Sequence, residues 1–148
     1  MTNTLVAYYS LTGNTKKIAN EISKVIGSNL FEITVAADTF PNGMFETADV
    51  AKEQRKTGNL PSLTSHIPEM SSYDKIIVAG PNWSGAVATP VVSFLKDIQG
   101  FAEQIISINT SVGQNDNLYN EDFREQANDL NVVLTVNNDA EKAIDYLK

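Results

Sequence analysis

Six consecutive residues near the start of the chain carry most of the groups that bind a phosphate. They are Ser10, Leu11, Thr12, Gly13, Asn14 and Thr15. The hydroxyls and the amide can donate hydrogen bonds, and Gly13 allows the backbone to approach a ligand closely. The segment has neither the glycine–lysine loop of nucleotide triphosphatases nor the three spaced glycines of dinucleotide-binding folds. It therefore predicts an anion site made of neutral donors, which suits the terminal phosphate of a tightly held cofactor.

Apolar residues on both sides of this segment predict the strand and the helix that position it. Residues 5–8 form a short apolar run, as in a buried strand. The helix is indicated by Ile18, Ala19, Ile22, Val25 and Ile26, which recur at the spacing of one helix face. This order directs free N–H groups of the helix N-terminus at one place, where the helix dipole favours an anion.

Four more strands and four more helices are expected along the rest of the chain. Apolar runs predict strands at residues 29–35, 74–80, 105–108 and 132–136. The helices are expected at residues 46–56, from Thr89 as N-cap, from about Asn120, and from Asn138 as N-cap. Five strands alternating with five helices predict an α/β, three-layer, doubly wound fold with a five-stranded parallel sheet in the order 2-1-3-4-5. Residues 37–73 then form an elaborated crossover of unassigned role.

Two further segments are expected at the same edge of the sheet as residues 10–15. In such sheets, ligands bind beyond the carboxyl ends of the strands, where the strand order reverses. The segment after the third strand supplies Pro81, Asn82, Trp83, Ser84 and Gly85, and the segment after the fourth supplies Thr110, Ser111, Val112, Gly113, Gln114 and Tyr119. All three segments should converge on one pocket.

Trp83 and Tyr119 are the candidates for stacking on an aromatic ligand. Trp83 is the only tryptophan, and its neighbours are small or polar, which favours a ring that faces a ligand rather than the core. Tyr119 would supply a second ring from across the pocket, although tyrosines also commonly anchor helix starts. With the phosphate segment, these rings describe a site for a phosphorylated planar heterocycle.

The sequence offers no residues for catalysis by the protein itself. The chain has no cysteine, which excludes disulfides, thiolate metal sites and a cysteine nucleophile. Its single histidine, His66, is expected in a loop. We find no acid–base pair, no metal-ligand cluster and no nucleophile dyad, so we assign no catalytic residue and no metal. Any chemistry must then come from the bound ligand.

Length and charge limit the partners. The 148 residues are most simply one domain, spanning residues 1–148. The formal net charge of −7 argues against nucleic acid and favours basic protein partners. The sequence shows no membrane-spanning segment and no secretion signal, so we expect a cytoplasmic, bacterial protein. We also expect a monomer.

The three segments together resemble the flavodoxins. Residues 10–15 are similar to their FMN phosphate loop, residues 80–85 to their tryptophan-bearing loop, and the stretch from Gly113 to Phe123 to the segment with their second stacking aromatic. The long crossover and Thr110-Ser111-Val112-Gly113 resemble a flavodoxin-like subgroup. The resemblance implies noncovalent FMN and single-electron transfer between redox proteins, a reductase and an acceptor.

Three alternatives to an electron carrier remain to be weighed. The first is an FMN-dependent NAD(P)H:quinone oxidoreductase, although no nicotinamide site is evident in the sequence. The second is a phosphoacceptor receiver domain, which is disfavoured because Tyr9-Ser10, Gly80-Pro81 and Thr110-Ser111 stand where its carboxylates and lysine would be. The third is a member of the same fold that binds a protein partner and no flavin.

Overall fold

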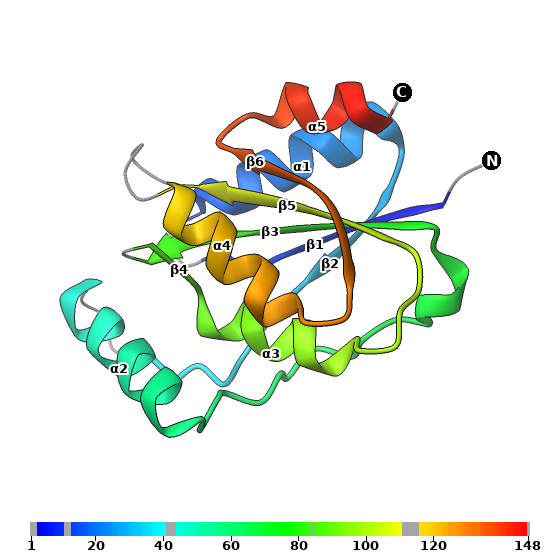
Figure 1. The fold of residues 1–148 in the computed structure, drawn as a ribbon. Coiled ribbons are helices and arrows are strands. Elements are labelled where there is room, and N and C mark those ends of the chain that lie inside the picture. The colour runs from blue at the N-terminus through cyan, green and yellow to red at the C-terminus, as the bar shows by residue number, and fades with distance from the viewer. Residues whose placement is uncertain (1–2, 11–12, 41–43, 84, 111–115, 148) are drawn as a thin grey trace.

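A parallel sheet with helices on both faces forms the framework of the molecule (Figure 1). The structure is a computed structural model and describes residues 3–10, 13–40, 44–83, 85–110 and 116–147. The sheet order is β2-β1-β3-β5-β6, with the short strand β4 paired to β3 outside this path. The predicted α/β fold and its order 2-1-3-4-5 are therefore confirmed, because β5 and β6 are the fourth and fifth strands of the prediction.

The strands and helices alternate along the chain. The strands are β1 (Thr4–Tyr8), β2 (Asn29–Glu32), β3 (Lys75–Trp83), β4 (Ala86–Val87), β5 (Gln104–Thr110) and β6 (Asn131–Asn137). The helices are α1 (Asn14–Ile26), α2 (Met44–Thr57), the 3-10 helix η1 (Met70–Ser72), α3 (Thr89–Asp97), α4 (Asp116–Ala127) and α5 (Ala140–Leu147). None of the helices in the described part of the chain is both long and apolar enough to cross a membrane.

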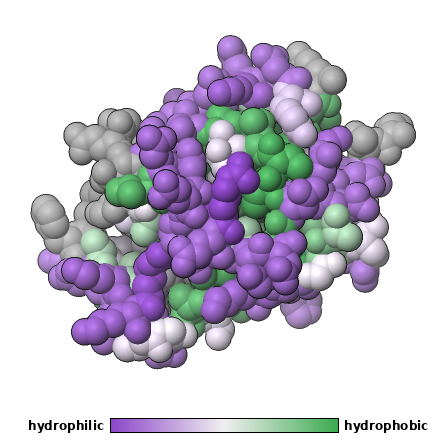
Figure 2. Space-filling model, in the orientation of Figure 1, coloured by the Kyte–Doolittle hydropathy of each residue, from purple (hydrophilic) through white to green (hydrophobic). Residues whose placement is uncertain are grey.

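Alternate residues of each central strand enter two separate cores. On β1, Leu5 and Ala7 pack toward α3 and α4, whereas Val6 and Tyr8 pack toward α1 and α5. This alternation follows from the period of two of a β-strand, and it explains why the central strands are apolar throughout. Figure 2 shows hydrophilic residues over most of one face, with a hydrophobic band where the edge strand β6 runs.

Several element ends differ from the prediction because local hydrogen bonds move them. The second strand ends at Glu32, and Val35 instead forms an isolated antiparallel bridge with Leu63 of the crossover. The N-cap of α3 is Ala88, and the hydroxyl of Thr89 donates to Gln54 at 2.6 Å rather than capping the helix. The fourth predicted helix begins at Asp116 rather than near Asn120.

The last helix and the segment after the third strand also differ from the prediction. The Asp139 carboxylate, rather than Asn138, accepts the N–H of Lys142 at 3.1 Å at the start of α5. Part of the segment expected after the third strand is folded into the antiparallel β3–β4 pair, in which Asn82 pairs with Val87 and Trp83 with Ala86. Residues 81–83 extend β3 beyond the predicted end at Gly80, so Trp83 stands on a strand and not in a free loop.

The crossover 37–73 contains the predicted helix and is attached to the body by polar contacts and by apolar side chains packed on the core. Helix α2 spans Met44–Thr57, close to the expected 46–56. In Figure 1 it stands apart from the sheet, at the end where β4 lies. Its C-terminal half is fastened by Gln54 to α3 and by Arg55 to α4. His66 is exposed in the same crossover, as expected of a loop residue.

Candidate functional site

Strand register brings the candidate segments to one edge of the sheet. Tyr8 pairs with Ala79, and the N–H of Tyr9 donates to the carbonyl of Ala79 at 3.0 Å. In the next pair of strands, Pro81 lies opposite Thr110. Ser10, Pro81 and Thr110 therefore lie near the carboxyl ends of three neighbouring parallel strands, at about the same level. Since β1 and β3 flank the point where the strand order reverses, this is the edge where such sheets bind ligands.

The segment before α1 is shaped as an anion cradle. Gly13 has a left-handed backbone with φ of 100°, which glycine adopts without strain. Its N–H donates to the hydroxyl oxygen of Ser10 at 2.9 Å, so the Ser10 O–H remains available as a donor. No side chain in the described part of the chain caps α1. Among the described residues, no side chain therefore competes with an external anion for the N–H groups of this first turn.

A hydroxyl pair joins this cradle to the end of β5. The hydroxyl oxygens of Thr15 and Thr110 lie 2.8 Å apart, and Thr15 is buried with 2% of its surface exposed. Each hydroxyl carries one proton, and one shared hydrogen bond uses only one of the two. The pair therefore keeps a second O–H that can donate to a ligand. The two segments were expected to converge, but the direct contact of these two threonines was not predicted.

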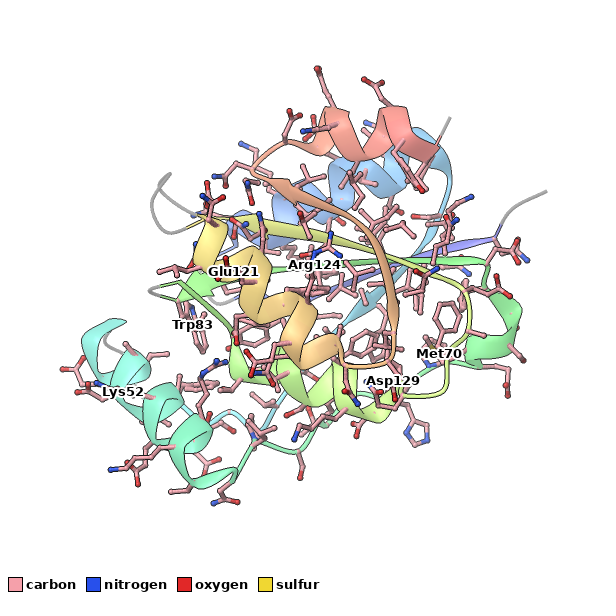
Figure 3. The ribbon with its side chains drawn as sticks, in the orientation of Figure 1. Lys52, Met70, Trp83, Glu121, Arg124 and Asp129 are labelled. Atoms are coloured by element: carbon pink, nitrogen blue, oxygen red, sulfur yellow. The ribbon has the colours of Figure 1, made fainter. Side chains whose placement is uncertain are left out.

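Trp83 is held between aromatic neighbours. Its ring centroid lies 5.9 Å from that of Tyr9 and 5.3 Å from that of Phe40, at interplanar angles of 85° and 80°. Such edge-to-face pairs are a favoured arrangement of aromatic rings. The indole is half-buried, and Figure 3 shows it in the space between the end of β3 and α2, which carries Lys52. Burial raises the pKa of Tyr9 to about 12, so its hydroxyl is neutral at physiological pH.

A groove of about 390 Å³ opens beside the indole. It is lined by Ala48, Asp49, Ala51, Lys52 and Arg55 of α2 and by Trp83, Ala86 and Val87 of the β3–β4 pair. Three of the lining residues are alanines, whose small side chains leave space for a ligand. The charged residues of the lining are Lys52, Arg55 and Asp49. The groove is large enough for part of a planar ligand and lies next to the residue predicted to stack.

The turn after Trp83 is closed by an asparagine. The side-chain oxygen of Asn82 accepts the N–H of Gly85 at 2.7 Å. Gly85 has φ of 86°, a left-handed conformation that explains glycine at this position. The predicted site residues Asn82, Trp83 and Gly85 thus form one structural unit.

Tyr119 does not have the position expected of a stacking residue. Its side chain is fully buried, with its ring 6.4 Å from that of Phe123 in a stacked arrangement. In this structure no face of the ring is free for a ligand, contrary to the sequence-based expectation. The physical reason is helical spacing: α4 begins before this residue, and Tyr119, Phe123 and Ala127 form its inner face. Burial and the nearby Asp122 carboxylate raise the pKa of Tyr119.

The structure locates ten of the predicted site residues. Leu11, Thr12, Ser84, Ser111, Val112, Gly113 and Gln114 lie outside the described residues. The structure adds Phe40, Tyr9, Arg55 and Asp122, which the sequence analysis missed. Tyr9 is adjacent to the phosphate segment, and Asp122 lies three residues after Tyr119, whereas Phe40 and Arg55 are distant in sequence and meet the site only in the fold. Among the described residues no group of acidic, histidine or cysteine side chains is arranged to hold a metal ion.

Comparison with known proteins places this arrangement in a family. The flavodoxin family model matches residues 3–142. A flavoprotein from Lactobacillus acidophilus NCFM, crystallised in complex with FMN, is 33% identical over all of both chains, with a TM-score of 0.94. No curated protein sequence matches the chain.

Two more distant structures share the fold. Flavodoxin 2 from Bacillus cereus, in its oxidised form, is 17% identical over 97% of this chain and 94% of its own, with a TM-score of 0.58. An NADH:FMN oxidoreductase, EMOB, in its apo form is 17% identical over 98% of this chain and 86% of its own, with a TM-score of 0.57. At these identities the likeness concerns the fold alone.

Proposed function

This chain belongs to the flavodoxin family, and from that premise we propose that it binds FMN noncovalently and carries single electrons between redox proteins. The single observation that carries the proposal is the meeting of an anion cradle and an aromatic wall at one sheet edge. The N-terminus of α1, which no described side chain caps, and the Thr15–Thr110 pair suit the phosphate, and Trp83 suits the ring. The FMN complex of the L. acidophilus relative supports the same ligand.

The protein's own residues would bind and orient the cofactor. FMN supplies the electron-accepting and electron-donating chemistry when it is bound. The first-turn N–H groups of α1 and the free O–H of the threonine pair would hold the phosphate with neutral donors. The fixed Asn82–Gly85 turn would present main-chain polar groups to the ring edge. Aromatic contacts from Tyr9 and Phe40 would keep the indole in place.

The acidic charge of the chain supports basic protein partners. With a formal net charge of −7, the protein would attract a basic reductase or acceptor and associate faster at low salt. We propose such proteins, rather than a small molecule, as the electron donor and acceptor. An electron-transfer rate that falls steeply between low and high ionic strength would support this part of the proposal.

Two measurements test the proposal in sequence. Purified chain mixed with FMN should quench flavin fluorescence with a stoichiometry of one, and riboflavin should bind more weakly because it lacks the phosphate. A potentiometric titration of the complex should then resolve two separate one-electron steps. A single two-electron step would argue against a carrier, and absence of FMN binding would refute the function altogether.

The groove beside Trp83 supports a second candidate, an FMN-dependent NAD(P)H:quinone oxidoreductase. Its volume of about 390 Å³ would admit part of a planar substrate, and its lining includes Lys52 and Asp49, whereas Arg55 is paired with Asp122. Rapid mixing of the FMN complex with NADPH, without any partner protein, separates the two functions. Flavin reduction within seconds would favour the oxidoreductase, whereas slow reduction that a reductase accelerates would favour the carrier.

A further inference from the structure

Two charged side chains from separate helices hold the main chain of Val87, four residues after Trp83. Arg55 of α2 and Asp122 of α4 form an ion pair, with 2.8 Å between Nη2 and Oδ1. The other carboxylate oxygen of Asp122 accepts the N–H of Val87 at 2.9 Å. Nη1 of Arg55 donates to the carbonyl of Val87 at 3.4 Å. One ion pair thus binds both main-chain polar groups of a single residue.

This ion pair acts on the turn that carries the tryptophan. In the β3–β4 ladder, Val87 lies opposite Asn82, and Ala86 lies opposite Trp83. A two-residue strand has too few ladder hydrogen bonds to be fixed by them alone. The buried Val87 side chain and the Asn82–Gly85 hydrogen bond hold part of this unit. The contacts of the Val87 main chain with Arg55 and Asp122 add the constraint that ties β4, and with it the turn from Trp83 to Ala86, to α2 and α4.

The ion pair is sheltered enough to be structurally significant. The side chains of Arg55 and Asp122 are 29% and 13% exposed. Oδ1 of Asp122 also accepts from Nε2 of Gln126 at 3.1 Å, so the carboxylate has three donors. Charge-assisted hydrogen bonds are stronger than neutral ones. Removal of either partner would leave the other charge partly buried without its counterpart.

We propose that Arg55 and Asp122 are positioning residues that fix the Trp83 turn against α2 in the geometry required by the flavin ring. The proposal rests on the proposed function, because the ring is that of FMN. Arg55, Trp83 and Val87 line the same groove, so the ion pair also sets its width. The proposal also assigns a role to the crossover, because α2 supplies Arg55, one partner of the ion pair.

Matched substitutions on the same two helices test the proposal. Asp122→Asn and Arg55→Gln remove the two charges of the pair. Glu121→Gln on α4 and Lys56→Gln on α2 make equal charge changes at exposed neighbours. Because Trp83 is the only tryptophan, its fluorescence reports on the turn without any cofactor. Circular dichroism would first establish that every variant is folded.

We expect the two test variants to shift Trp83 emission and to increase its quenching by acrylamide in the FMN-free chain. The Kd for FMN should rise roughly tenfold in both, because FMN binding must then order a turn that the ion pair holds in place in the wild type. The two controls should keep the wild-type emission and stay within about twofold in Kd. Arg55→Lys retains the charge but cannot bond Asp122 and the Val87 carbonyl with two separate nitrogens, so its Kd for FMN should be intermediate.

The outcomes separate this inference from the proposed function. Wild-type emission and wild-type FMN affinity in folded Asp122→Asn and Arg55→Gln would overturn the positioning role while the FMN function stood. If one variant failed to fold, Arg55→Lys would decide between the same two results. Failure of the unaltered chain to bind FMN would overturn the function and the flavin part of the inference, and the emission of the variants would still show whether the pair fixes the turn.

Discussion

Substitution of Gly80 by alanine should destabilise the protein through a contact with one methyl group. Gly80 is the last residue of β3 before the site segment, and its backbone is not in the left-handed region. Glycine is needed here because there is no room for a side chain. A Cβ at this position would lie 2.8 Å from Cγ2 of Val91, whereas carbon atoms pack at about 3.5–4.0 Å.

The cost of this contact follows from the surroundings of Val91. The side chain is fully buried on α3, and a valine in a helix strongly prefers one rotamer, so it cannot turn away easily. Overpacking of this kind costs about 1–3 kcal/mol. Urea unfolding followed by Trp83 fluorescence measures the loss, and thermal unfolding should show Tm lowered by about 2–4 °C for each kcal/mol.

A double variant gives the control. Val91→Ala alone should cost about 1–3 kcal/mol because it removes two buried methyl groups. In Gly80→Ala/Val91→Ala the clash is absent, and the remaining neighbours, Cβ of residue 91 and the hydroxyl of Tyr119, lie at ordinary distances of 3.8 and 3.5 Å. The double variant should therefore lose at least about 1 kcal/mol less than the sum of the single losses. Strict additivity, or a Gly80→Ala variant as stable as wild type, would refute the reasoning.

Three further predictions concern the site and its titrating groups. Thr15→Val should weaken FMN binding roughly tenfold but riboflavin binding little, since it removes a hydroxyl at the phosphate cradle; equal losses in two fluorescence titrations would contradict this. Trp83→Ala should raise the FMN dissociation rate measured by stopped flow, whereas Trp83→Phe, which keeps an aromatic face, should raise it less. The free energy of unfolding should fall as pH rises from about 10 to about 12, because the pKa of tyrosine is about 10 in the unfolded chain and that of buried Tyr9 is about 12. Urea unfolding measured across this pH range should show a shallower fall in Tyr9→Phe than in the wild type.

The sheet and the location of the site could be predicted because both depend on patterns local in sequence. Continuous apolar runs mark the central strands, and small or hydroxyl residues follow three of them. Once a doubly wound sheet is inferred, strand register alone brings Ser10, Pro81 and Thr110 to one edge. The element ends were harder to predict, because they depend on single hydrogen bonds between distant residues, such as that from Thr89 to Gln54.

The side-chain partners within the site could not be predicted for the same reason. Tyr119 looks from the sequence like an exposed aromatic residue after a glycine, yet four-residue spacing with Phe123 places it inside once α4 begins at Asp116. Arg55 and Asp122 are 67 residues apart, and nothing near either one indicates its partner. Phe40 lies in a crossover without clear periodicity, so its contact with Trp83 has no sequence signal.

The two halves of the site are held by different kinds of interaction, and this difference predicts how each responds to change. The phosphate half stands on the strand ends and on buried Thr15, so the register of three parallel strands fixes it. The ring half stands on a two-residue strand tied down by side chains from α2 and α4. Substitutions in the crossover should therefore alter the contacts with the flavin ring, while the contacts with the phosphate stay nearly constant. With FMN bound as proposed, substitutions in the crossover would change the flavin environment without loss of the cofactor, because the proposed phosphate cradle lies elsewhere.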